Sequence, residues 1–200
     1  MWSRQFKSVV VQVVPILNCV SNAWSPSIGD PTWIGWITVV GYLSAAIFSL
    51  RLGGVRKFKK VERIFWSAAG VGLLFLAANK QLDLQSAITA IGRCHAQLQG
   101  WYDDRRAIQI DLILGLVFVS LFASALLMWM LRGTLHRTGI GLAGIFIITS
   151  FVLVRAVGFH HVDRLIGMDF GHVRMNWLLE LGGILVFIIG CCKASAASNE

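Results

Sequence analysis

The residues best suited to chemistry lie between the last two long apolar stretches of the chain. His160, His161 and Asp163 follow the first of these stretches, and His172 precedes the second. Imidazole and carboxylate groups are the ligands that zinc and other divalent metals prefer, and they also serve as general acids and bases. The pattern therefore predicts a divalent metal such as zinc on His160, His161 and His172, or an acid–base pair of His161 and Asp163.

Glu180 extends this group into the last apolar stretch. His172, Asn176 and Glu180 are spaced four residues apart, so on one continuous helix they share a face. A glutamate inside a membrane helix is costly unless it is paired, which marks it as a candidate for function. We therefore predict Glu180 as a catalytic residue beside His161 and Asp163, orienting the histidines.

No strict metal signature supports the histidine prediction. The spacing does not match the His-Glu-x-x-His pattern, and a Cys-x-x-Cys-His haem attachment sequence is absent. The alternative is a set of interfacial histidines that are hydrogen-bonded to acids and backbone carbonyls.

Three arginines form the second component of the predicted site. The planar guanidinium group binds phosphate or carboxylate through two hydrogen bonds, so Arg105, Arg106 and Arg155 are predicted to bind a ligand together with Asp83. The alternative is that these arginines pair with acids and hold helix ends together. Arg155 lies a turn inside an apolar stretch, where an arginine costs about 2.5–3.5 kcal/mol. We expect Glu180 or Asp111 as its partner.

A short stretch of this region resembles a known family. Arg155, His161 and Asp163 are similar to the last motif of the membrane phosphatases related to phosphatidic acid phosphatase. The resemblance implies a histidine nucleophile, oriented by an aspartate, that attacks a lipid phosphate held by arginines. Here the acid follows His161 by two residues where the family has four, and the family's Pro-Ser-Gly-His motif is absent. The resemblance therefore does not assign the chain to that family.

The composition predicts an all-α, polytopic membrane helical bundle. Hydrophobic residues make up 56% of the chain and charged residues 14%, whereas a soluble domain has nearer a quarter charged. The apolar stretches are long enough to span a bilayer. The formal charge of +8 comes from basic residues that flank these stretches, and no nucleic-acid-binding motif accompanies it. We predict five spans, at residues 32–52, 64–78, 107–131, 140–159 and 176–192.

The distribution of basic residues predicts the orientation. Residues 51–63 hold six Lys or Arg and one acid, Glu62, which favours a cytoplasmic loop. The polar residues described above then lie at the opposite, extracytoplasmic face. Cys19 and Cys94 lie there too and could form a disulfide, although two separate thiols are equally consistent with the sequence.

Three further segments surround the spans. Residues 1–30 are predicted as an interfacial or signal-like segment, with a short sixth span as the alternative. Residues 82–99 are predicted as an amphipathic helix on the outer face, ended by Gly100. Residues 31–193 form the transmembrane domain, and residues 194–200 a polar tail.

Two functions fit this pattern. In the first, an integral protein of a bacterial inner membrane binds a metal ion or an anionic lipid-like ligand at its outer face, and could act as a hydrolase or transferase. In the second, the chain is a non-catalytic subunit or assembly factor of a larger membrane complex. The expected partners are the lipid bilayer and, in the second case, a membrane protein. Nucleic acid is not expected.

Overall fold

The chain folds into long apolar helices that are joined by short connections. The computed structural model describes residues 15–25, 28–100, 105–157, 169–170 and 173–199. Five of the helices within these ranges are long and apolar enough to cross a membrane, which confirms the predicted helical membrane bundle. The spanning helices are α2 (Trp33–Gly53), α3 (Lys60–Leu82), α5 (Arg105–Leu131), α6 (Leu135–Val157) and α8 (Met175–Asn199), and the other named elements are α4 (Leu84–Gln99), β1 (Asp169–Phe170) and β2 (Val173–Arg174).

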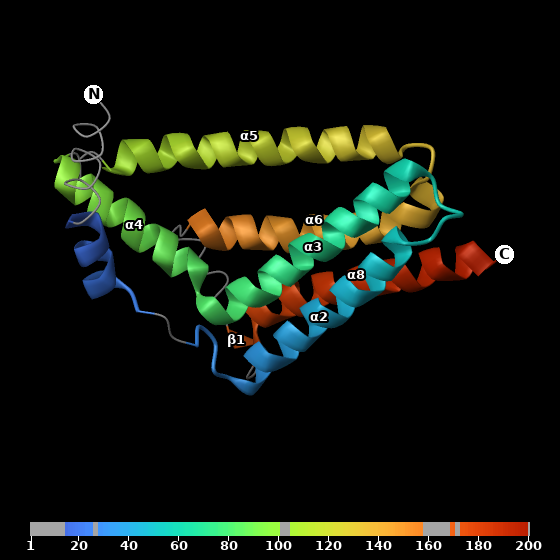
Figure 1. Cartoon of the computed structure of the whole chain (residues 1–200), viewed down its shortest axis with the longest axis horizontal. Coiled ribbons are helices and arrows are strands. Elements are labelled where there is room, and N and C mark those ends of the chain that lie inside the picture. The colour runs from blue at the N-terminus through green and yellow to red at the C-terminus, as the bar shows by residue number, and fades with distance from the viewer. Residues whose placement is uncertain (1–14, 26–27, 101–104, 158–168, 171–172, 200) are drawn as a thin grey trace, which may run out of the picture.

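Four of the spanning helices form the core of the protein. α2 packs along α3, α6 packs along α8, and α8 also contacts α2 (Figure 1). The Trp66 indole is fully buried between these helices, with its ring 4.9 Å from that of Phe65 and 5.8 Å from that of Phe187. We call the end of the bundle that holds the 54–59 connection the inner end and the opposite end the outer end, after the predicted orientation.

Small residues allow α6 and α8 to lie in direct backbone contact. A Cβ atom added to Gly144 would lie 2.5 Å from the backbone nitrogen of Phe187, and one added to Gly190 would overlap the backbone of Gly141. Gly141 in turn lies under the ring of Trp66. Such contacts are typical of membrane helices. Lipid tails are as apolar as the helix surfaces, so the hydrophobic effect does not drive the helices together and their association depends on close packing.

α5 is set apart from this core. Only 6% of its apolar stretch, Leu114–Leu131, is buried, and it makes few contacts with α3 and α6 (Figure 1). α4 joins the outer end of α3 to the start of α5. Exposed apolar surface is the normal state of a helix in lipid, so this exposure alone does not indicate a partner.

Two residues in the left-handed region set the direction of α4. Asp83 has φ 47° and separates α3 from α4, so the helix predicted over residues 82–99 begins after this residue. Asp is one of the few non-glycine residues that adopt this conformation readily. Gly100, with φ 76°, ends α4 as predicted.

The last spanning helix begins within one residue of its predicted start but extends beyond its predicted end. α8 continues to Asn199, through most of the segment predicted as a polar tail. At its start, β2 occupies Val173–Arg174 and pairs with β1 in an antiparallel register. The expectation that residues 172, 176 and 180 share one continuous helix is therefore wrong, because residues 173–174 are a strand.

A disulfide between Cys19 and Cys94 ties the helical residues 15–23 to α4. The Cα atoms of the two cysteines are 5.9 Å apart. Disulfides persist in oxidising compartments, so this bond adds an argument, independent of the basic loop, for an outer end that faces away from the cytoplasm.

The disulfide is expected to stabilise the outer end. Replacing Cys19 with serine should lower the free energy of unfolding by about 2 kcal/mol, because the bridge closes a long loop and restricts the unfolded chain. Thermal unfolding in detergent measures the change, and replacing the exposed free Cys192 with serine is the matched control. Equal melting temperatures for the Cys19 variant and the wild type would contradict the expectation.

Candidate functional site

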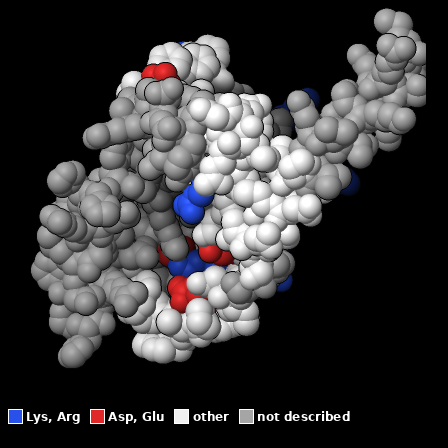
Figure 2. All heavy atoms as spheres, turned by 90° about the vertical axis from the view of Figure 1, so that its left-hand side faces the viewer, with Lys and Arg blue, Asp and Glu red and all other residues white. Residues whose placement is uncertain are grey.

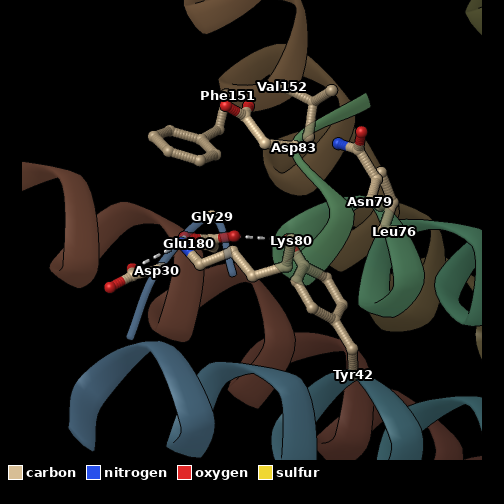
Figure 3. Close-up of a pocket in the computed structure, with 10 residues that line it drawn as sticks. All are labelled: Gly29, Asp30, Tyr42, Leu76, Asn79, Lys80, Asp83, Phe151, Val152 and Glu180. Carbon is tan, nitrogen blue, oxygen red and sulfur yellow. Dashed lines mark hydrogen bonds and ion pairs between the residues drawn. The ribbon is translucent and has the colours of Figure 1, made fainter. Parts of the chain in front are cut away.

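A buried ion pair joins three helices at the outer end of the bundle. Lys80 lies in the last turn of α3, and its Nζ is 2.8 Å from Oε2 of Glu180, in the second turn of α8. The two side chains are only 5% and 4% exposed. The Tyr42 hydroxyl from α2 donates to the other carboxylate oxygen of Glu180 at 3.0 Å (Figure 3). Both oxygens of this glutamate are therefore engaged, which satisfies the requirement for a charge buried in a membrane helix.

A second carboxylate approaches Lys80 from the segment that precedes α2. Oδ2 of Asp30 lies 3.5 Å from the lysine Nζ, and Oδ1 accepts a 2.6 Å hydrogen bond from the Thr32 hydroxyl. The Gly29 backbone N–H donates to the carbonyl of Gln81 at 2.8 Å. A side chain at Gly29 would press on Lys80 and the α3–α4 joint, so glycine allows the segment to lie directly on the end of α3.

The pKa of Asp30 is lowered. Burial alone would raise it, but the hydrogen bond from the Thr32 hydroxyl and the positive charge of Lys80 outweigh that effect. A carboxyl with a lowered pKa stabilises the folded state above its ordinary pKa of 3.8, and this stabilisation is lost as the pH falls through the lowered value.

The contribution of Asp30 should therefore depend on pH in a defined direction. The melting temperature of an Asp30→Asn variant should lie below that of the wild type at neutral pH. The loss of stability should stay below about 1 kcal/mol, because the ion pair of Asp30 is partly exposed. The difference should shrink as the pH falls below the ordinary carboxyl pKa. Cys192→Ser, at an exposed position of α8 outside the site, is the control and should melt like the wild type at each pH tested. A difference for Asp30→Asn that grows in acid would contradict the assignment.

A polar cavity of about 40 Å³ adjoins the ion pair. Asn79 and Asp83 from the α3–α4 joint and Phe151 and Val152 from α6 line it, together with the ion-paired residues (Figure 3). The volume exceeds the roughly 10–15 Å³ that one water needs, so the cavity admits a small polar group but no whole lipid. Figure 2 looks onto this end and shows acidic and basic side chains together in a hollow.

The described part of the site carries an excess of negative charge. One ammonium group, Lys80, faces three carboxylates, those of Asp30, Asp83 and Glu180. With all four ionised, the net charge is +1 − 3 = −2. This balance favours a ligand group that donates hydrogen bonds or carries positive charge, such as an amine, over an anion.

Among the predicted site residues, Asp83 and Glu180 are the two whose side chains the structure describes, and both line the same cavity. The rest stay untested. His160, His161, Asp163 and His172 lie outside the described residues. Arg105, Arg106 and Arg155 belong to helices α5 and α6, but their side chains are not among those described. Within the described ranges, no group of three histidines, cysteines or acids is arranged to hold a metal ion.

Lys80, the partner of Glu180, was not predicted. The expectation that Arg155 pairs with Glu180 or Asp111 stays a prediction, and the structure shows Lys80 and Tyr42 on the two oxygens of Glu180. A signal for Lys80 exists in the sequence. The buried positions Trp66, Leu73 and Ala77 of α3 follow a spacing of seven and four, and the next step of three reaches Lys80 on the same face.

A second buried acid lies at the inner end. Glu62 is fully buried, and Nη1 of Arg137 is 3.9 Å from its Oε2. Neither of its oxygens, nor Nε1 of the neighbouring Trp66, has a hydrogen-bond partner among the described atoms. The sequence places Glu62 in a basic loop, whereas the structure turns it into the bundle.

Comparisons of the chain with protein families, with curated proteins and with solved structures each found no match, so the candidate site is interpreted from its own geometry.

Proposed function

We propose that this integral membrane protein binds a membrane ligand at its outer end, through a hydrogen-bond-donating group such as an ammonium or hydroxyl. The observation that carries the proposal is the cavity beside the Lys80–Glu180 pair. Asp83 supplies the third carboxylate that lines this cavity, after those of Asp30 and Glu180. Lys80 is matched by Glu180, whereas no hydrogen bond or ion pair links the Asp83 carboxylate to another described residue. A donor on the ligand would satisfy that carboxylate.

The charge balance changes the ligand class expected from the sequence. An anionic head group would meet a net negative charge in the described part of the site, and only the predicted arginines, Arg105, Arg106 and Arg155, could offset it. An amine meets carboxylates directly and forms charge-assisted hydrogen bonds, which are stronger than neutral ones.

Thermal shift in the presence of defined lipids tests the proposal, because a ligand that binds only the folded protein raises its melting temperature. Dioleoyl phosphatidylethanolamine, which has an N–H donor, should raise the melting temperature. Dioleoyl phosphatidylcholine, whose ammonium is positively charged but bulkier and without an N–H donor, should raise it less, and dioleoyl phosphatidic acid, which has no ammonium, should not raise it. Asp83→Asn should abolish the shift, whereas Lys193→Gln, at an exposed position near the inner end of α8, should keep it. A shift with phosphatidic acid that survives Asp83→Asn would support the anionic ligand and overturn the amine.

A reaction at this end, hydrolysis or group transfer, depends on the predicted residues His160, His161, Asp163 and His172. A divalent metal such as zinc bound by the histidines would supply a Lewis acid there. Metal analysis of the purified protein tests this part. Stoichiometric metal that is lost in His161→Ala or His172→Ala would support it, and metal-free protein with full ligand binding would leave a binding protein without a reaction.

In the alternative function, a subunit or assembly factor of a membrane complex, α5 is the helix that a partner would contact. α5 spans the membrane with only 6% of its apolar stretch buried, so most of its surface is available to lipid or to another helix. We propose that the native membrane is a bacterial inner membrane. Purification from that membrane in mild detergent tests the alternative function. A partner retained in fixed ratio, and lost on substitutions along the exposed face of α5, would support the subunit.

A further inference from the structure

An apolar groove runs between α5 and the core, within the membrane-spanning part of the protein. Its volume is about 390 Å³, and it is bounded by α3, α5 and α6. Phe65 and Leu73 of α3, Leu127 and Met130 of α5, and Ile148 of α6 are among its walls. The groove includes one hydroxyl, that of Thr149, which donates to the carbonyls of residues 145 and 146 in its own helix. The groove therefore offers a ligand only apolar contacts.

The groove exists because α5 approaches the core at one end only. One face of α5 carries its more buried residues, which are the partly buried Ser120, Ser124 and Leu127 and the buried Leu131. Leu131 is completely enclosed at the inner end, whereas Leu114 is 61% exposed toward the outer end. On the opposite wall, α3 presents small residues, including Gly72. A Cβ added at Gly72 would have no heavy atom within 4 Å.

The apolar groove and the polar cavity meet at one side chain. Leu76 of α3 lines both of them. On α6, Ile148 and Thr149 line the groove, and Phe151 and Val152 line the cavity less than one turn further toward the outer end. A single molecule with a polar head and an apolar tail could therefore occupy the two sites together.

We infer that the groove binds the acyl chain of the ligand whose polar group enters the outer cavity, so that the ligand is a lipid. This inference rests on the proposed function. The volume of about 390 Å³ lies in the range of about 300–1,000 Å³ that is typical of small-molecule sites, which suits an acyl chain.

Photolabelling in vesicles tests the inference. The protein is reconstituted in dioleoyl phosphatidylethanolamine that contains a trace of the same lipid with a diazirine on one acyl chain. The labelled peptides should come mainly from the groove walls on α3, α5 and α6, in excess of the outward faces of α2 and α8. Gly72→Phe should lower labelling of the groove by about tenfold, because a Cβ at this position meets no heavy atom within 4 Å and the ring attached to it would occupy the groove. Gly115→Phe, at an exposed position of α5 with equal free space, is the control.

The outcomes separate the groove from the head-group site. Uniform labelling of all apolar faces, unchanged in Gly72→Phe, would overturn the acyl-chain site even if the phosphatidylethanolamine thermal shift persists. Groove labelling that is lost in Gly72→Phe but unchanged in Asp83→Asn would establish the acyl chain and refute the proposed head-group contact. A crosslink between two copies of the chain through the groove would show that a protein helix occupies it and would also overturn the inference. Gly72→Leu repeats the test if Gly72→Phe does not melt like the wild type.

Discussion

Replacing Lys80 with methionine should destabilise the bundle more than most single substitutions in the chain. Methionine keeps the length of the side chain but removes the cation, so Glu180 would remain buried beside Tyr42 alone. Breaking one partner of a buried ion pair costs about 3–5 kcal/mol. At about 2–4 °C per kcal/mol for a chain of this size, the melting temperature should fall by roughly 6–20 °C.

A second variant identifies the unpaired charge as the cause. Lys80→Met combined with Glu180→Gln removes both charges and leaves an amide oxygen that can still accept from Tyr42, so most of the lost stability should return. Lys60→Met, at an exposed lysine of the same helix, is the matched control and should melt like the wild type. If the double variant is as unstable as Lys80→Met alone, the packing of the lysine side chain, and not its charge, holds the helices together.

The sequence predicts the spanning helices well because their cause is local. A stretch of about 20 apolar residues spans a bilayer whatever the rest of the chain does, and charged residues mark its ends. The first and third spans were predicted at residues 32–52 and 107–131, and the structure has Trp33–Gly53 and Arg105–Leu131. The second span was predicted too short at both ends. The structure begins it at Lys60 and extends it to Leu82, because Glu62 and Lys80 are buried in the bundle, each near an oppositely charged group that no local rule predicts.

The site was harder to predict because it depends on contacts between distant residues. Lys80 and Glu180 are 100 residues apart, and Asp30 reaches Lys80 only because Gly29 lets its segment lie on the end of α3. The depth of Arg155 in its span suggests Glu180 or Asp111 as its partner, and that argument does not reach Lys80. The spacing of the buried face of α3 identifies Lys80, but that face can be recognised only once the inward-facing positions of the helix are known.

A different kind of long-range contact should make Gly190 the most sensitive glycine of α8. At this position α8 meets the backbone of α6 at Gly141, and even a single Cβ would overlap it. Replacing Gly190 with leucine must therefore separate the two helices, and the contact cannot be relieved by turning a side chain, since the atoms opposed to it are backbone. Forcing extra volume into a close-packed core costs about 1–3 kcal/mol or more, and we expect the upper end or beyond. Thermal unfolding and the monodispersity of the purified protein measure the loss.

The same helix provides the control. A Cβ added at Gly182 has no heavy atom within 4 Å, so leucine fits there, and its better helix propensity should leave stability unchanged or raise it by up to about 1 kcal/mol. Opposite outcomes at two glycines eight residues apart would show that backbone contact between α6 and α8, and not glycine as such, holds this pair. That contact also fixes the position of Glu180 on α8 relative to Lys80. A Gly190→Leu variant that still folds should therefore lose the burial of the Lys80–Glu180 ion pair. Equal stability of the two leucine variants would mean that α6 and α8 do not approach as closely as the glycines permit.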